Sequence, residues 1–509
     1  MRLMASMPVL PEGKRARLLA LIAVLVIVGL IASTLAYERG WRIGEGEGGK
    51  PSTPTLEPPF VLTDGGFDHP VMDAMQGSNE PCIAVSATDP MNLVAGSNDY
   101  ATPTSDAWCG YYWSFDGGKR WEHGLIPGYP DGPTSALTGF EAAGDPVVMA
   151  GPNGEFYFAG IAFKRSTPNL GRYSGIFVAK STDGGRTFGQ VTMVTRSFLA
   201  TTFHDKEWMA VDPNNGNVYV TWTLFNGPVS QIVFSKSTDG GGRFTQIPKV
   251  LNEIRALEFQ NQGSQVIVDR TGTIHVTWID YRSATEGVNR YTFSTDEGDT
   301  WSTPVDVCSV TYIADPLPNN GYRTPTMEAF AVDNTGGPYD GSLYLVWPDQ
   351  RAGDADILMV YSRDNGATWS PEPIRVNDDL NNTADQFFPA VCVAGNGTVV
   401  VTFYDRRDDP ENVLLMYYMA QSVDGGATFL PNIPVTDKQF DGNAGGGRRK
   451  GGVFSGTPFM GDYTGVAATK GFVVAIWCDT RNGTPEQPNS DIYVARVTYA
   501  AVKAGSTAG

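Results

Sequence analysis

Apolar residues recur along this chain in short runs that come in pairs. Most runs have five or six residues, and Gly, Asn, Asp, Ser or Pro separates one run from the next. Runs of this length, bounded by turn-forming residues, are typical of β-strands. The pattern therefore predicts an all-β chain. The seven pairs are 81–85 with 92–96, 146–150 with 155–160, 207–211 with 217–222, 264–268 with 273–278, 328–332 with 342–347, 389–393 with 398–403, and 463–468 with 472–477.

A polar motif, Ser-x-Asp-x-Gly-x-(Thr/Arg)-(Trp/Phe), follows each of the first six pairs. Asp and Gly suit a tight turn, because Asp accepts hydrogen bonds from nearby backbone N–H groups and Gly tolerates positive φ. Each motif therefore predicts a hairpin turn between two strands. Steps of 56 to 68 residues indicate one supersecondary unit used repeatedly. The copies begin at Ser114, Ser181, Ser237, Ser294, Ser362 and Ser422.

This motif is the Asp-box, or BNR, repeat, and the chain resembles the Asp-box β-propeller proteins, of which the sialidases are the best known. The repeats and their flanks cover about residues 78–498. The resemblance implies a β-propeller of four-stranded antiparallel blades. Seven strand pairs predict seven blades, whereas sialidases typically have six, so a six-bladed ring remains the alternative. The last pair has no Asp box, and we expect Pro59–Leu62 or the C-terminal tail to close that blade.

The N-terminal part of the chain predicts export. Residues 18–37 are almost all apolar and follow basic residues, which fits either a signal peptide or a membrane anchor. Residues 1–17 would be the cytoplasmic or n-region, and 38–58 a Gly/Pro-rich flexible tether. The propeller would span 59–499 and a tail 500–509. We expect the membrane to be contacted through the N-terminal segment only.

Charge and cysteine content narrow the range of partners. The net charge of −18 argues against a nucleic-acid partner, since nucleic acids require a basic surface. Five scattered cysteines and four histidines form no metal-binding motif, so we expect no metal and no cofactor. The oxygen-rich loop 377–385 could hold Ca²⁺. It lacks the glycine and the spacing of a known calcium loop, so a solvated turn is the simpler interpretation. A monomer that binds a glycan or glycoconjugate is expected.

A second repeat, (Trp/Phe)-x-Asp-x-Arg, lies at the ends of four predicted strands. Its i, i+2, i+4 spacing places the three side chains on one side of an extended strand. One interpretation is structural, with each Asp bracing an Arg of its own or the neighbouring blade. The other is recognition of an acidic sugar, because a guanidinium group pairs bidentately with a carboxylate. Sialidases use three arginines in this way. The repeat supplies Arg282, Arg351, Arg407 and, as a spare, Arg481.

The resemblance also implies catalytic residues. Glu328 starts a strand whose partner leads to Arg351, which is similar to the arrangement of the catalytic Glu in sialidases. Tyr463, at the start of the last blade, is similar in position to the sialidase nucleophile. A neutral Tyr assisted by a Glu base can attack an anomeric carbon beside a carboxylate. Both could equally be ordinary channel-lining residues.

The acid/base residue has no clear family context. Asp145, Asp205 and Asp462 all precede predicted strands, and Asp205 is preferred because it belongs to the densest polar cluster, His204–Glu207. The Arg-Ile-Pro motif of sialidases is absent from the first blade. The sequence therefore predicts an exported, sialidase-like glycoside hydrolase acting on an acidic sugar. The alternatives are a propeller that binds glycan or protein without turnover, and another polysaccharide-degrading enzyme with a carboxylate pair in the channel.

Overall fold

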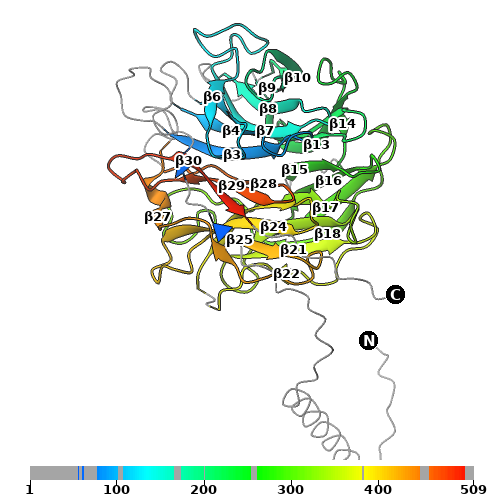
Figure 1. Ribbon diagram of the computed structural model, residues 1–509. Coiled ribbons are helices and arrows are strands. Elements are labelled where there is room, and N and C mark those ends of the chain that lie inside the picture. Colours follow the sequence, from blue (N-terminus) through cyan, green and yellow to red (C-terminus); the bar gives the residue numbers. More distant parts are fainter. Residues whose placement is uncertain are drawn as a thin grey trace, which may run out of the picture. The chain divides into compact units, whose positions relative to one another are not determined.

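A computed structural model describes most of the predicted propeller, as seven antiparallel sheets (Figure 1). Its described residues are 55–56, 60–61, 77–100, 107–164, 174–199, 201–253, 261–380, 383–446 and 458–498. Five sheets have four strands and two have five. The innermost strands contact one another in sequence, and the last contacts the first, so the sheets form the blades of a closed ring. The prediction of a seven-bladed, all-β propeller is confirmed.

The first three blades follow the chain in order, each strand pairing antiparallel with its neighbour. Blade 1 contains β3 (Ser78–Val85), β4 (Leu93–Asp99), β5 (Trp108–Ser114) and β6 (Glu122–Leu125); blade 2 contains β7 (Ala142–Ala150), β8 (Phe156–Phe163), β9 (Ser174–Ser181) and β10 (Gln190–Ser197); blade 3 contains β11 (Thr202–Val211), β12 (Val218–Asn226), β13 (Val229–Ser237) and β14 (Lys249–Val250).

The next three blades repeat this order. Blade 4 contains β15 (Asn261–Val268), β16 (Ile274–Tyr281), β17 (Glu286–Ser294) and β18 (Val305–Thr311); blade 5 contains β19 (Ala329–Val332), β20 (Leu343–Asp349), β21 (Asp356–Ser362) and β22 (Ile374–Arg375); blade 6 contains β23 (Gln386–Val393), β24 (Val399–Asp405), β25 (Leu414–Ser422) and β26 (Ile433–Pro434), with β27 (Phe440–Asp441) also on β25. A short 3₁₀ helix, η1 (Gly442–Ala444), follows β27.

Blade 7 joins the two ends of the propeller. Its own strands are β28 (Gly465–Ala468), β29 (Phe472–Asp479) and β30 (Asp491–Thr498). The fourth position is filled by β1 (Thr55–Leu56) and β2 (Phe60–Val61), which both pair antiparallel with β30. The closing strand therefore comes from the N-terminal side, as one of the two predictions had it. Because β1 lies inside the predicted tether 38–58, the paired part of the chain begins before residue 59. Closure in this way leaves the ring without a long free edge.

The Asp boxes form the predicted turns after the third strand of each of the first six blades. In the copy that begins at Ser294, the Ser hydroxyl donates to Asp296, and the backbone N–H of Gly298 donates to the Ser hydroxyl. Asp296 also accepts hydrogen bonds from the backbone and side chain of Thr300. Hydrogen bonds from Thr300 and Ser294 lower the pKa of Asp296 to about 2. The box aspartates are thus used in the turn, as the sequence analysis expected.

Gly298 allows a tight contact between blades 3 and 4. Its φ is +82°, and a Cβ atom there would lie 2.4 Å from Cε1 of the buried Phe234 on β13. We expect Gly298→Ala to lower the free energy of unfolding by about 1–3 kcal/mol more than Gly336→Ala, because of this overlap. Gly336 is the matched control, since its φ is also positive and its Cβ would meet nothing within 4 Å. Urea unfolding of the two variants measures the difference, and equal losses would contradict the packing described here.

No disulfide bond joins any of the five cysteines. All five cysteines are free thiols; Cys82, Cys109 and Cys478 are buried, whereas Cys308 and Cys392 are only partly so. The apolar segment 18–37 lies outside the described residues. Among the residues that are described, no helix is long and apolar enough to cross a membrane.

Candidate functional site

The strands that line the ring share a distortion where they begin. The pairing of β3, β7, β11, β15 and β23 with the next strand shifts register by a β-bulge near the start of each. One residue in each bulge has a positive φ: Glu80 at 54°, Asp145 at 56°, Lys206 at 50°, Gly263 at 74° and Phe388 at 50°. Positive φ costs a residue other than Gly about 1–3 kcal/mol, and such strain is concentrated at functional sites. Bulges also re-aim side chains.

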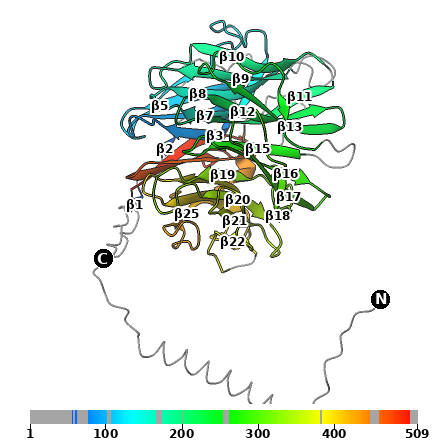
Figure 2. The ribbon, with the colours of Figure 1, turned by 90° about the vertical axis from the view of Figure 1, so that its right-hand side faces the viewer.

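The side chains of three of these bulge residues, Glu80, Asp145 and Lys206, meet at one face of the ring. We call this face, where the innermost strands begin and the second strands end, the mouth face (Figure 2). The Asp boxes lie on the opposite face, because they follow third strands that run away from the mouth. We call the charged and polar residues that gather at the mouth face the central cluster. Its members are Glu80, Asp145, Asp205, Lys206, Glu207, Arg323, Asp462 and Tyr463.

The ammonium group of Lys206 is the centre of this cluster. Its Nζ lies 2.6 Å from Asp462, 2.9 Å from Asp145 and 3.5 Å from Glu80. The three carboxylates come from blades 7, 2 and 1, whereas Lys206 comes from blade 3. The side chains of all four residues are almost fully buried. Their negative charges hold the pKa of Lys206 well above its usual value, despite the opposing effect of burial. The ion pairs of Lys206 therefore connect four blades of the ring.

Arg323 adds a second cation from the loop between β18 and β19. Its Nε and Nη2 donate to the two carboxylate oxygens of Asp462 at 2.6 and 2.5 Å. The guanidinium group also lies 4.9 Å from the centre of the Phe459 ring. The Arg323 side chain is 46% exposed, whereas that of Asp462 is 2% exposed. Arg323 is thus the member of the cluster that faces solvent most.

Two carboxyl groups of the cluster have pKa values shifted in opposite directions. Burial, together with the nearby carboxylates of Asp145 and Asp462, raises the pKa of Asp205 to about 6, although Lys206 opposes this. Lys206 and Arg323 overcome the effect of burial on Asp462 and lower its pKa to about 2. Asp205 is only partly buried and accepts a hydrogen bond of 3.1 Å from Gln262. Near neutral pH, Asp205 therefore exchanges a proton, whereas Asp462 remains ionised.

Glu207 and Tyr463 complete the cluster. Glu207 is buried, and neither of its carboxylate oxygens has a hydrogen-bond partner among the described residues. Burial and the charge of Asp145 raise its pKa well above the usual value. The Tyr463 hydroxyl donates to the carbonyl of Pro146 at 3.3 Å, and the Lys206 ammonium lies 5.7 Å from the ring centre. Burial and the charge of Glu80 raise the pKa of Tyr463 well above its usual value.

The three predicted catalytic residues do not all meet. Asp205 and Tyr463 both lie in the central cluster, and both interact with Lys206. Glu328 is buried in blade 5, and neither of its carboxylate oxygens has a hydrogen-bond partner among the described residues. Burial, together with the nearby Glu328 carboxyl group, raises the pKa of Tyr281. No hydrogen bond joins Glu328 and Tyr463 in the described part of the chain, and their pairing in catalysis stays a prediction.

The four arginines of the second repeat each pair within their own blade. The guanidinium groups donate to Asp280, Asp349, Asp405 and Asp479 at 2.7–2.8 Å. Each also reaches an outer-strand or loop group of the same blade or the one before it. These partners are Asp306 for Arg282, the Ser309 carbonyl for Arg351, Asp378 for Arg407 and Asp437 for Arg481. This is the bracing arrangement that the repeat also allowed. Carboxylate binding by these arginines stays a prediction, and it would require the pairs to open.

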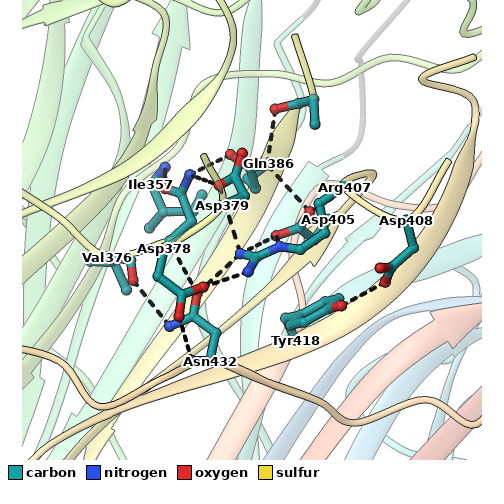
Figure 3. Close-up of polar contacts among 12 residues, drawn as sticks. Ile357, Val376, Asp378, Asp379, Gln386, Asp405, Arg407, Asp408, Tyr418 and Asn432 are labelled. Carbon is teal, nitrogen blue, oxygen red and sulfur yellow. Dashed lines mark hydrogen bonds and ion pairs between the residues drawn. The ribbon is translucent and has the colours of Figure 1, made fainter. Parts of the chain in front are cut away.

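Figure 3 shows this bracing in blades 5 and 6, at the loop 377–385, which the sequence analysis considered as a Ca²⁺ site. Arg407 lies between Asp405 and Asp378, and Asn432 bonds to both Arg407 and Asp378. Asp379 accepts hydrogen bonds from Asn377 and Arg375. No group of three or more His, Cys, Asp or Glu residues that could hold a metal ion occurs among the described residues. Oδ1 of Asp379 thus accepts from protein donors, whereas its Oδ2 has no hydrogen-bond partner among the described residues.

The sequence analysis missed two members of the cluster, Glu80 and Arg323. Glu80 is the first of two acidic residues that directly precede Pro on a bulge, the other being Asp145 before Pro146. This acid–Pro dipeptide at a strand start is a signal that the sequence contains. Arg323 has no such signal, because its partner Asp462 lies in another blade. Lys206 was noted only as a neighbour of Asp205.

Comparisons with known proteins agree with the fold. A family model of the BNR/Asp-box repeat matches residues 360–371, which contain the fifth Asp box. No curated protein matches the sequence. The repeat and the ring of blades together make the chain an Asp-box β-propeller.

Solved structures of similar fold include three that act on glycans. A Hadza microbial sialidase, Hz136, is 15% identical, with 81% of this chain and 73% of that chain covered and a TM-score of 0.44. A PL25 ulvan lyase is 11% identical, with coverages of 82% and 94% and a TM-score of 0.46. An α-L-arabinanase of Penicillium chrysogenum is 14% identical, with coverages of 69% and 92% and a TM-score of 0.41.

Proposed function

We propose that this protein is a glycoside hydrolase whose active site is the central cluster. One observation carries the proposal: Asp205 and Asp462, in a single polar cluster at the mouth face, have pKa values of about 6 and about 2. Two carboxyl groups whose environments separate their pKa values in this way can act as an acid and an ionised partner. Glycosidic bonds are most often hydrolysed by such a pair.

In this proposal Asp205 is the general acid. It is partly exposed, and burial with neighbouring carboxylates keeps its carboxyl group protonated to a higher pH than an ordinary Asp. It would give its proton to the glycosidic oxygen as the bond breaks, which makes the leaving group neutral. Gln262, at 3.1 Å, orients the carboxyl group.

Asp462 would supply the negative charge that the reaction needs. Hydrogen bonds from Lys206 and Arg323 keep it ionised, at 2.6 Å from Nζ and 2.6 and 2.5 Å from the guanidinium group. An ionised carboxylate stabilises the positive charge that develops at the anomeric carbon, or activates a water molecule. Lys206 and Arg323 are positioning residues, since they act through Asp462.

The sialidase-like version of this reaction remains a finer alternative. It makes Tyr463 the nucleophile, Glu328 its base, and Arg282, Arg351 and Arg407 the site of the sugar carboxylate. Its support is that Tyr463 lies in the cluster beside Lys206 and 6.4 Å from Trp208, measured between ring centres. Against it, the Tyr463 hydroxyl is bonded to a carbonyl group and its pKa is raised. Export, which residues 18–37 predict, would bring either version into contact with extracellular glycans.

The test is a screen for cleavage by the full chain, purified in detergent because of segment 18–37. The substrates are neutral and acidic polysaccharides together with 4-methylumbelliferyl glycosides, including the α-sialoside. We expect hydrolysis of at least one glycan, its loss in Asp205→Asn and Asp462→Asn, and retention in Tyr463→Phe. Loss in Tyr463→Phe with turnover of the α-sialoside would favour the sialidase-like version. Binding of glycans without any cleavage would make the protein a glycan-binding propeller instead.

A further inference from the structure

We infer that the sugar held in the central cluster is uncharged rather than acidic. The inference rests on the proposed function and names the substrate class of the same site. It reverses the acidic sugar that the sequence predicted, because the charges at the mouth face are distributed differently from what an acidic sugar requires. A carboxylate is bound where a cation is left without a partner or can form a bidentate pair.

The two cations of the central cluster are already matched by carboxylates. Lys206 faces three of them, those of Asp462, Asp145 and Glu80. Arg323 uses Nε and Nη2 for the two oxygens of Asp462, which is the fork that would otherwise receive a sugar carboxylate. An acidic sugar would have to displace a protein carboxylate from one of these cations, leaving that carboxylate buried and unpaired.

The arginines of the second repeat offer no substitute. Each guanidinium group is bonded to the Asp of its own repeat and to a second group, which for Arg282, Arg407 and Arg481 is another Asp. The predicted clamp residues thus carry no unmatched positive charge. In the described part of the chain, the six cations of the cluster and the repeat are all in ion pairs.

Among the described residues of the cluster, carboxyl groups outnumber cations. Asp205 has Gln262 as its hydrogen-bond partner, and Glu207 is buried in the cluster without a hydrogen-bond partner among the described residues. Burial favours the protonated forms of Glu80 and Glu207. Even if both hold protons, Lys206 and Arg323 still face Asp145 and Asp462. Among the described residues of the cluster, the net charge is therefore neutral or negative in either protonation state.

The consequence for binding follows from desolvation. A sugar carboxylate entering this site would lose its hydration and meet Asp205 and the neighbouring carboxylates without gaining a free cation. An uncharged sugar would instead donate hydroxyl hydrogen bonds to the partly exposed Asp205 and avoid this repulsion. Like charges brought together in this way cost several kcal/mol, so we expect a preference of at least about 100-fold in kcat/KM for the uncharged sugar.

The experiment compares substrates that differ in one carboxylate. The full chain is assayed on 4-methylumbelliferyl glucosides against glucuronides and galactosides against galacturonides, in both anomers, and on galactan against polygalacturonate. Faster cleavage of the uncharged members supports the inference. Equal or faster cleavage of an acidic member overturns the inference about the sugar. The proposed hydrolase activity would still be supported by that result. If nothing is cleaved, the proposed function fails, and calorimetry with galactan and polygalacturonate oligosaccharides decides this inference separately. Tighter binding of the galactan oligosaccharides supports it; tighter binding of the acidic ones, or none of either, overturns it.

A charge variant makes the test sharper. Asp145→Asn removes one of the three carboxylates around Lys206, and we expect it to raise the acidic-to-neutral ratio of kcat/KM, or of binding constants, by at least about tenfold. Asp299→Asn is the matched control, because it removes the same charge from an exposed pair with Lys236 in an Asp box. An unchanged ratio in Asp145→Asn would count against the inference. If circular dichroism shows that this variant is misfolded, Asp145→Ser removes the same carboxylate and leaves a smaller polar side chain.

Discussion

Asp205→Asn is expected to lower kcat/KM for glycan hydrolysis by about 10²–10⁴-fold, the usual contribution of a general acid. The amide has nearly the shape of the carboxyl group and can still bond to Gln262, so the fold should be retained. What is lost is the proton for the glycosidic oxygen. Substrates with an already acidic leaving group, such as 4-methylumbelliferyl glycosides, should lose much less activity than polysaccharides, because they need little protonation.

The pH dependence of the wild type follows from the same residue. Only the protonated form of Asp205 can act as the acid, and its pKa is raised to about 6. Activity should therefore be highest below this value and fall as the pH rises through it, until nearly all Asp205 is ionised. Asp462, with a pKa of about 2, stays ionised over this whole range. In Asp205→Asn the fall near pH 6 should disappear. A fall that persists in the variant would assign the proton to another group.

Lys206→Met is expected to cause the largest loss of stability of any single substitution at the mouth face. It leaves Asp462, Asp145 and Glu80 buried around an apolar side chain of similar length. Removing one partner of a buried ion pair typically costs about 3–5 kcal/mol. The matched control is Lys236→Met, whose partner Asp299 is 70% exposed, and exposed pairs contribute at most about 1 kcal/mol.

The sign of the pH effect provides a check on this second prediction. Lys206 lowers the pKa of Asp462, so in wild type that carboxylate contributes stability above its ordinary pKa and loses it as the pH falls toward 2. Without Lys206 the surrounding carboxyl groups can be buried only when protonated. The loss caused by Lys206→Met should therefore be greater at pH 7 than at pH 4. Urea unfolding at the two pH values measures it; an equal loss at both would mean that packing, not charge, is what Lys206 provides.

The fold could be predicted from the sequence because its signals are local and repeated. Each Asp box contains all the donors and acceptors of its own turn, as the bonds among Ser294, Asp296, Gly298 and Thr300 show. The apolar pairs gave the seven blades for the same reason, since each strand pairs with its neighbour along the chain. Closure by β1 and β2 was foreseen only in part, because a two-residue strand leaves little pattern.

The site was predicted less completely, because its contacts join distant segments. Asp205 and Tyr463 were chosen for their place at strand starts, and both lie in the central cluster. Arg323 could not be found, because its partner is 139 residues away along the chain. The bulge conformation of Glu80 and Lys206, which aims them at each other, depends on the pairing of whole strands. The second repeat showed that Arg and Asp share a strand face, but it did not show that they would bond to each other.

The central claim is that the cluster hydrolyses a glycosidic bond with Asp205 as the acid. The most direct test is cleavage of a glycan in isotopically labelled water, followed by mass spectrometry of the products, for the wild type and Asp205→Asn. The account predicts one labelled oxygen at each newly formed reducing end, none at the new non-reducing end, and almost no cleavage in the variant. Unlabelled, unsaturated ends would mean elimination rather than hydrolysis. Those ends, or undiminished cleavage of the polysaccharide by Asp205→Asn, would contradict the account.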